Sequence, residues 1–223
     1  MFAGHIGAAL AIGCSERRLN IGVFVLAALL LDITLWSFVL LGWESVVIPP
    51  NFIATHQPEF TFPFSHGLAA SVAWSAAAAC VVFASGARLG ASRVRAAALV
   101  SAAVFSHWLL DALVHRPELP IAGAGSFAVG VGLWQRMPLA LAIEALILAA
   151  GLALFLPGAQ LSRARKTCLA VLCVVVLVFT VLGMTIAPAP PSAAAMASSS
   201  LATIAVVCAL VYWLAKARLE PRA

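Results

Sequence analysis

Long apolar segments separated by short polar ones repeat along almost the whole chain. The apolar runs lie at roughly residues 2–14, 20–42, 66–86, 96–115, 137–156, 167–187 and 200–216. Because a backbone in contact with lipid must satisfy its own hydrogen bonds, runs of this length predict membrane-crossing helices. The first run is the exception, since about 13 residues at ~1.5 Å each reach roughly 20 Å, short of the ~30 Å hydrocarbon core. The pattern predicts an all-α fold, a polytopic membrane helix bundle of about seven transmembrane helices.

The positive charges follow the same alternation. Eleven of the 13 Lys and Arg residues lie in alternate gaps between the runs, at Arg17, Arg18, Arg88, Arg93, Arg95, Arg163, Arg165, Lys166, Lys216, Arg218 and Arg222. The other gaps, 43–65, 116–136 and 188–199, contain only Arg116 and Arg136. Because cytoplasmic loops are enriched in positive charge, we expect the N-terminus outside and the C-terminus inside.

The composition excludes a soluble domain. Hydrophobic residues make up 64% of the 223 residues and charged residues only 9%, so we expect a single integral membrane domain over residues 1–223. The net charge of +5 comes from basic residues in short loops, so no nucleic-acid partner is expected. The five cysteines form no Cys-x-x-Cys pair, and we expect them to be small packing residues.

The sharpest constellation of candidate functional residues is the segment S-H-W-L-L-D-A-L-V-H-R-P at residues 106–117. His107, Asp111 and His115 are spaced i, i+4, i+8, so they drift only about 40° per step and line one helix face. His107 lies about 12 Å deeper along the helix axis than His115. Ionisable groups at such depth normally face the bundle interior and are functional, which favours a cation site. For His115, a helix-end residue at the lipid headgroups is the alternative.

Asp32 interrupts the apolar run at 20–42. An unpaired carboxylate inside a membrane helix costs roughly 2.5–3.5 kcal/mol on insertion scales, so something must compensate for it. No Lys or Arg occupies a predicted helix core in this chain, which favours a bound metal ion. A protonated Asp32, hydrogen-bonded to a neighbouring helix, is the alternative.

Further candidate groups lie towards the same ends of other runs. His5 follows the start of the first run, and His66 opens the third run in F-P-F-S-H-G. Glu144, about two turns into the fifth helix, is a candidate metal ligand, hydrogen-bond partner of a ligand histidine, or general base. His56 and Glu59 belong to a predicted outer loop, where we expect them to be solvated.

The order of these residues resembles the membrane-bound metal-dependent hydrolase family of bacterial inner membranes (YdjM-like). The matching elements run from residue 2 to about residue 150: an early H-x-x-x-A/G, an Asp in the second helix, F-S-H-G/S, H-x-x-x-D on a helix, and a later Glu. Those proteins look like membrane relatives of the zinc-dependent phospholipase C and S1-P1 nuclease fold. The resemblance implies a bacterial inner-membrane location, with the metal site facing the periplasm.

The resemblance also implies a ligand set for one zinc ion, namely Asp32, His66, His107 and Asp111. The additional histidines of the soluble pattern match His5 and His115. The pattern's N-terminal Trp ligand is absent, and Ala140 stands where its H-x-x-x-E motif has a histidine. The resemblance therefore implies one or two metal ions rather than three.

Together these features predict a membrane-bound, metal-dependent hydrolase. Histidine and carboxylate ligands suit Zn²⁺ best, with Mn²⁺ or Fe²⁺ as alternatives. The ion would lower the pKa of a bound water, and Asp111 or Glu144 would accept its proton. Arg116 and Arg136, the only cations in the outer gaps, are candidates to hold a phosphate. We expect a phosphoester of a membrane lipid or lipid-linked substrate, entering laterally between helices.

Two other function classes remain open. A proton or metal-ion transporter would use Asp32 and the histidines as relay sites, but the inner halves of the predicted helices offer almost only Ser, Thr and Cys. A non-catalytic metal-bound scaffold would have a closed ligand shell, whereas a catalytic site keeps an open position. In either case residues 1–156 are expected to form the metal-site bundle. Residues 157–223 would then supply two peripheral packing helices, which are also a candidate surface for a homo-oligomer.

Overall fold

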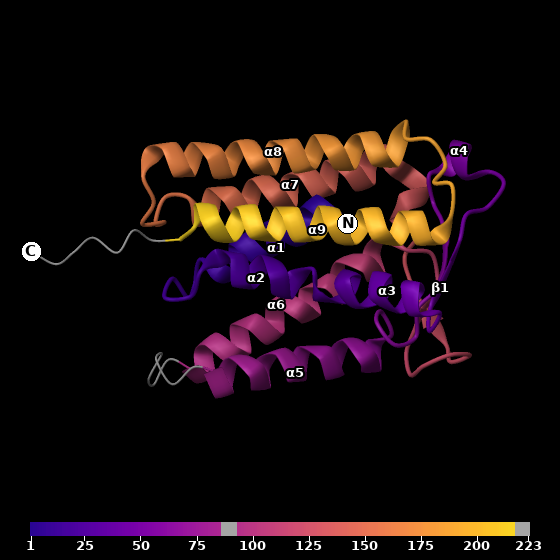
Figure 1. The fold of residues 1–223 in the computed structure, drawn as a ribbon, viewed down its shortest axis with the longest axis horizontal. Coiled ribbons are helices and arrows are strands. Elements are labelled where there is room, and N and C mark those ends of the chain that lie inside the picture. The colour runs from indigo at the N-terminus through magenta and orange to yellow at the C-terminus, as the bar shows by residue number, and fades with distance from the viewer. Residues whose placement is uncertain (86–92, 217–223) are drawn as a thin grey trace, which may run out of the picture.

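The computed structural model describes residues 1–85 and 93–216, and this part of the chain is built mainly of helices (Figure 1). Its α-helices are α1 (Phe2–Gly13), α2 (Ile21–Ala28), α3 (Leu30–Leu41), α4 (Phe52–Thr55), α5 (Leu68–Ser85), α6 (Arg93–Val114), α7 (Met137–Phe155), α8 (Arg163–Thr185) and α9 (Ala193–Leu214). A 3₁₀ turn, η3 (Leu133–Arg136), leads into α7. The predicted helical bundle is therefore confirmed.

Two small antiparallel hairpins complete the described part of the chain. Strand β1 (Ser45–Val47) pairs with β2 (Glu59–Thr61), and β3 (Leu119–Pro120) pairs with β4 (Ala128–Val129). The first hairpin connects α3 to α5, and the second connects α6 to η3 and α7. Both lie at the same end of the bundle (Figure 1).

Five helices are long and apolar enough to cross a membrane: α5, α6, α7 with its preceding η3 turn, α8 and α9. The pair α2 and α3 makes a sixth crossing if the two helices form one bent span. Helix α1 is apolar but has only 12 residues. The structure thus supports a multi-pass membrane protein with five or six spans by length and composition. The predicted count of seven would require α1 to cross as well.

The basic segments gather at the end of the bundle opposite the hairpins (Figure 1). Arg95 Nη2 donates a hydrogen bond to the Ser15 carbonyl at 2.7 Å, and Arg165 donates to the carbonyl of Lys216. These contacts join loops far apart in the sequence, as the predicted alternation requires. Of the basic residues in that alternation, Arg88, Arg218 and Arg222 lie outside the described residues.

The apolar run at 20–42 is not the single helix that its pattern predicts. Helices α2 and α3 meet at an angle of 48°, with Leu29 between them at φ −101° and ψ 5°. The Ala28 carbonyl at this break accepts a hydrogen bond from Nδ1 of His107, 2.6 Å away. A side chain that takes a carbonyl from the helix ladder is a recognised cause of a helix bend. The break also brings Asp32, in the first turn of α3, towards α6.

Helix α1 is held against α7 by two glycines. A Cβ atom placed on Gly7 would lie 2.6 Å from the carbonyl oxygen of Ile147, and one placed on Gly151 would overlap the backbone of Gly7. Only residues without side chains allow helices to approach this closely in a membrane protein. The close approach brings the Gly4 amide within 3.1 Å of Glu144 Oε1, so α1 and α7 share a hydrogen bond.

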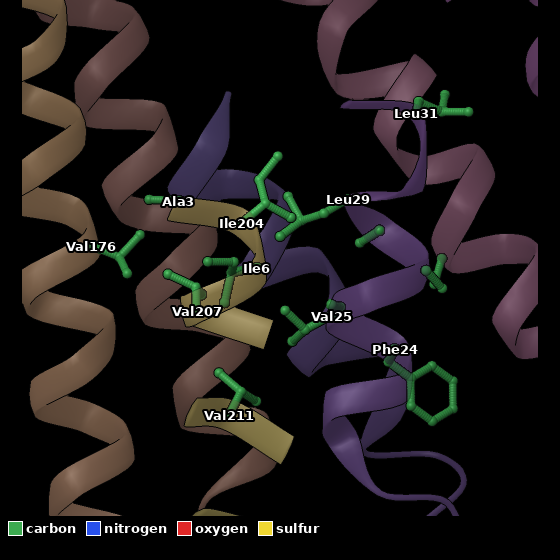
Figure 2. Packing of buried hydrophobic residues seen from close by; sticks show 14 of the residues in the cluster. Ala3, Ile6, Phe24, Val25, Leu29, Leu31, Val176, Ile204, Val207 and Val211 are labelled. Atoms are coloured by element: carbon green, nitrogen blue, oxygen red, sulfur yellow. The ribbon is translucent and has the colours of Figure 1, made fainter. Parts of the chain in front are cut away.

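The core of the bundle is a cluster of aliphatic side chains from helices distant in sequence (Figure 2). Ile6 of α1, Val25 of α2, and Ile204 and Val207 of α9 lie together with Val176 of α8, and all are at most 6% exposed. Helices α8 and α9 therefore contribute to the same core as the N-terminal helices. By contrast, the outward faces of α8 and α9 are apolar and exposed, as expected for surfaces in contact with lipid.

Candidate metal centre

Asp111 stands at the centre of a group of four buried histidines drawn from three parts of the chain: α1, the segment before α5, and α6 with the residue after it. Its Oδ1 lies 3.2 Å from Nε2 of His5, and its Oδ2 lies 3.4 Å from Nε2 of His66. Nε2 of His107 and of His115 lie 3.2 Å and 3.7 Å from the same Oδ2. All five side chains are buried, with residue exposures of 5% or less. The predicted convergence of these residues is therefore found in the structure.

Asp32 approaches the same group from the break between α2 and α3. Its Oδ1 lies 3.8 Å from Nε2 of His66 and 3.8 Å from Nε2 of His107. Its side chain is 21% exposed, whereas that of Asp111 is 4% exposed. These six residues, His5, Asp32, His66, His107, Asp111 and His115, are called the histidine cluster below.

The hydrogen bonds around His107 and His66 fix the proton positions on both rings. Nδ1 of His107 faces the Ala28 carbonyl, which can only accept, so this nitrogen carries the proton. Nδ1 of His66 lies 2.9 Å from Ser65 Oγ, and that hydroxyl donates to Glu44 Oε2 at 2.7 Å. The Ser65 oxygen is thus left as an acceptor, and His66 also carries its proton on Nδ1.

In the neutral rings, the two Nε2 atoms therefore present lone pairs to each other. They lie only 3.1 Å apart, at a distance where an unprotonated pair of nitrogens repels. A cation between them, or an extra proton on one ring, removes this conflict. The two rings could therefore hold a metal ion or share an extra proton between their Nε2 atoms.

The spacing of the donor atoms could accommodate a metal ion. Zn–N distances of about 2.0–2.1 Å place neighbouring ligand atoms roughly 3.3–3.4 Å apart. The Nε2 atoms of His66 and His107, with Asp111 Oδ2 and Asp32 Oδ1, are separated by 3.1 to 3.8 Å in the five pairs measured. Two sets of three, His5 with Asp32 and His107, and His66 with His107 and Asp111, each have ligand atoms within 4.8 Å of one another. Mn²⁺ and Fe²⁺ accept the same donor types.

His5 and His115 complete the cluster in different ways. The His5 ring stacks on the His107 ring, with centroids 3.7 Å apart, and His5 Nδ1 has no hydrogen-bond partner among the described residues. His115 has its Nδ1 2.6 Å from Glu118 Oε1, which leaves Nε2 directed towards Asp111. Asp111 Oδ1 also lies 3.4 Å from the Met1 amino nitrogen.

Glu144 lies beside the cluster rather than within it. Its carboxylate is 2% exposed, and its Oε1 accepts the hydrogen bond from the Gly4 amide. In the described part of the chain it makes no hydrogen bond to a histidine of the cluster. The position suits a group that acts on a molecule in the neighbouring cavity better than it suits a metal ligand.

Three supporting residues, Glu44, Ser65 and Glu118, were not anticipated by the sequence reasoning. Glu44 is 5% exposed, and its Oε1 also accepts from the backbone amides of Phe64 and Ser65, at 2.8 and 2.9 Å. Partners of this kind orient the ligand histidines and raise their basicity. Only Ser65, adjacent to His66 in F-P-F-S-H-G, offered a local sequence signal.

The two outer-loop residues expected to be solvated behave differently from each other. Glu59 is exposed, as expected, with a side-chain exposure of 52%. The expectation for His56 was wrong, because this residue is only 8% exposed and its ring packs near that of Phe52, with centroids 5.7 Å apart. His56 sits at the end of α4 in a left-handed conformation, with φ 51°, which turns it into the cavity wall.

The two candidate phosphate-binding arginines lie away from this centre. Arg116 Nε donates to Glu118 Oε2 at 3.2 Å, and Nη2 lies 3.4 Å from Glu59 Oε1. The hydrogen bond with Glu118 raises the pKa of Arg116. Arg136 is exposed at the end of η3. Neither arginine is among the described residues that line the cavity, so phosphate binding by either stays a prediction.

A cavity of about 310 Å³ opens beside the cluster. At one side it is lined by the ionisable residues Asp32, His66, Asp111, His115 and Glu144. Aromatic residues of the first hairpin, among them Phe60 and Phe62, form another wall. Residues of α8 and α9 form the rest, so these helices contribute to the site as well as to the packing expected of them. The cavity leaves one side of the donor set open to a small molecule.

Comparisons of this chain with protein-family models, with curated proteins and with solved structures found no match. The histidine cluster and its cavity are therefore the basis for assigning a function.

Proposed function

We propose that this protein is a membrane-bound, metal-dependent hydrolase that cleaves a phosphoester of a lipid or lipid-linked substrate. The observation that carries the proposal is the pair of Nε2 atoms of His66 and His107, 3.1 Å apart beside Asp111 and Asp32. Two neutral imidazoles and two carboxylates form a ligand set suited to Zn²⁺. The adjoining cavity supports a catalytic role, because catalytic zinc sites keep a position open to substrate or water.

In the proposed reaction, the residues of the site have different roles. A divalent ion held by the cluster supplies a Lewis acid that lowers the pKa of a coordinated water towards neutrality. Asp111, at the centre of the histidines, acts as a ligand and balances the charge of the ion. Glu144, on the cavity wall, takes up a proton released in the cavity. The aromatic residues Phe60 and Phe62 limit access of bulk water from the side of the hairpin.

The first test measures metal and hydrolysis together on the purified protein. We expect about one or two zinc ions per chain by elemental analysis, as the resemblance to the hydrolase family implies. Hydrolysis of a chromogenic phosphodiester in detergent should stop on chelation and return with Zn²⁺. A metal-free protein would contradict the ligand assignment. A zinc-loaded protein that cleaves no phosphoester, ester or amide would favour the scaffold or transporter alternatives.

We also propose that the protein lies in a bacterial inner membrane with the histidine cluster on the periplasmic side. The clustering of basic segments at the opposite end of the bundle supports this orientation. In a background without native cysteines, an impermeant thiol reagent added outside should label Ala54→Cys and Ala122→Cys but leave Ala164→Cys unmodified. All three positions are exposed. The reverse labelling pattern would invert the orientation.

A further inference from the structure

The cavity beside the histidine cluster continues into the space between α8 and α9. On α8 it is lined by Phe179, Gly183 and Met184, and on α9 by Met196, Ser200 and Thr203. These six residues are called the α8–α9 slot. None of them is charged.

Three hydroxyl groups in and next to the slot have partners within their own helices, whereas the described residues provide no hydrogen bond for Ser200 Oγ. Thr203 Oγ1 donates to the Ser199 carbonyl at 2.9 Å, and Ser199 Oγ donates to the Met196 carbonyl at 3.0 Å. On the facing helix, Thr180 Oγ1 donates to the Val176 carbonyl at 2.9 Å. With these three donors occupied, the slot presents mainly methyl, methylene, thioether and aromatic groups to a ligand, together with the Ser200 hydroxyl. One cavity thus has an ionisable end at the cluster and an apolar end at the slot.

The slot reaches the outer surface of the bundle at Phe179, which lines the cavity and is 57% exposed. Around it on the outer face of α8 lie Val175, Val178 and Leu182, exposed by 57%, 50% and 46%. Helix α8 is one of the candidate membrane spans. An opening framed by exposed apolar side chains on a membrane helix faces hydrocarbon, so a ligand enters it from the bilayer.

We infer that the α8–α9 slot binds a hydrocarbon chain of an anionic membrane lipid, whose phosphate-bearing head group lies at the histidine cluster. The charge and polarity of the cavity match such an amphiphile, with cation-binding groups at one end and an uncharged apolar channel at the other. A volume of about 310 Å³ is at the small end of ligand pockets, which favours one chain over a pair. The head-group assignment rests on the proposed function, whereas chain binding does not require hydrolysis.

Gly183 is the position at which this inference can be tested most directly. A Cβ atom placed there meets nothing within 4 Å, so a side chain can be added without displacing a neighbour. Gly183→Trp is expected to fill the slot from α8. Val171→Trp is the matched control, because it puts the same side chain on the same helix at an exposed site outside the cavity lining and away from the opening at Phe179.

The first measurement is photocrosslinking of phosphatidic acid with a diazirine on its acyl chain, in phosphatidylcholine nanodiscs. In the wild-type protein we expect labelled peptides that include residues 179–184 and 196–204. Gly183→Trp should lower this labelling at least tenfold, whereas Val171→Trp should leave it unchanged. Zinc content equal to that of the wild type shows that the variant is folded. Should Gly183→Trp fail to fold, Ser200→Phe fills the same space from α9. Undiminished labelling in the folded slot variant would overturn the inference.

The second measurement separates this inference from the proposed function. Turnover of long-chain phosphatidic acid is divided by turnover of the soluble chromogenic phosphodiester, and this ratio should fall at least tenfold in Gly183→Trp. An unchanged ratio with active enzyme would leave the hydrolase proposal in place and remove the slot from substrate binding. If the wild type cleaves neither compound, the hydrolase proposal fails, and the crosslinking result alone decides whether the slot holds a lipid chain.

Discussion

The histidine cluster and the α8–α9 slot belong to one cavity but are built in opposite ways. In the cluster, the rings are held in set orientations by hydrogen bonds to the Ser65 hydroxyl (which itself donates to Glu44), to the Ala28 carbonyl and to the Glu118 carboxylate. In the slot, the lining side chains are uncharged and mostly apolar. Loss of one polar partner should therefore lower the affinity of the cluster for a metal ion. A change in the slot should alter which molecules bind and leave the metal in place.

The largest effect is expected from Asp111→Asn. Asparagine keeps the shape of the side chain but removes the negative charge that faces four histidines. Zinc affinity should fall by more than the about 10–100-fold that outer hydrogen-bond partners contribute, and hydrolysis should be lost with it. Zinc per chain and turnover are measured on the same preparation. Glu59→Gln, at an exposed carboxylate, is the control. Full zinc occupancy in Asp111→Asn would remove Asp111 from the ligand set.

Glu144→Gln tests whether proton transfer can be separated from metal binding. The amide oxygen can still accept from Gly4, so the contact between α1 and α7 is retained. We expect zinc content near the wild-type value and turnover lowered by roughly 10²–10⁴-fold. Loss of zinc would place Glu144 among the ligands, and undiminished turnover would end its role as a base.

Glu44→Gln tests the hydrogen-bond relay behind His66. A glutamine amide can donate to Ser65, which would free the hydroxyl to donate to His66 Nδ1 and move the ring proton to Nε2. Zinc affinity should then fall about 10–100-fold. Histidine ¹⁵N NMR of the zinc-free protein should report the change of tautomer, a signal that a purely structural defect does not produce. Ser65→Ala, which removes the relay, separates tautomer control from packing. A weaker affinity with an unchanged tautomer would argue against the relay.

The smallest effect is expected from Arg116→Gln. This side chain is 47% exposed and its partner Glu59 is 52% exposed, so that ion pair contributes less than about 1 kcal/mol to stability. We expect KM for the chromogenic phosphodiester to change by less than about threefold, within the range that exposed ion pairs produce. An increase in KM of an order of magnitude in Arg116→Gln or Arg136→Gln would instead support the predicted phosphate contact.

The proximity of most cluster residues could be predicted from two regular patterns in the sequence. Helical periodicity placed His107 next to Asp111 and His115, and the alternation of loop charge brought Asp32 and His66 to the same end of the bundle. The bend at Leu29 could not be predicted in this way, because neither glycine nor proline marks it. Its partner, His107, comes from a helix far along the chain.

The residues that support the cluster were missed for a related reason. Glu44 meets Ser65 because the β1–β2 hairpin pairs Ser45 with Thr61, and no periodic pattern specifies the register of so short a hairpin. The role of α8 and α9 was hidden because a binding surface made of shape alone carries no distinctive residue type. Gly183 looks like any small residue in an apolar run until its surroundings are known.

The close contact of α1 with α7 has a consequence for how the protein is made. A helix of 12 residues is about 18 Å long and cannot hold a transmembrane position by its own hydrophobicity. Its partner on α7 is 140 residues further along the chain, so α1 reaches its final place only after the translocon has released most of the protein. Because His5 is part of α1, it joins the other histidines of the cluster only late in biogenesis. Metal loading would then report that membrane insertion has been completed.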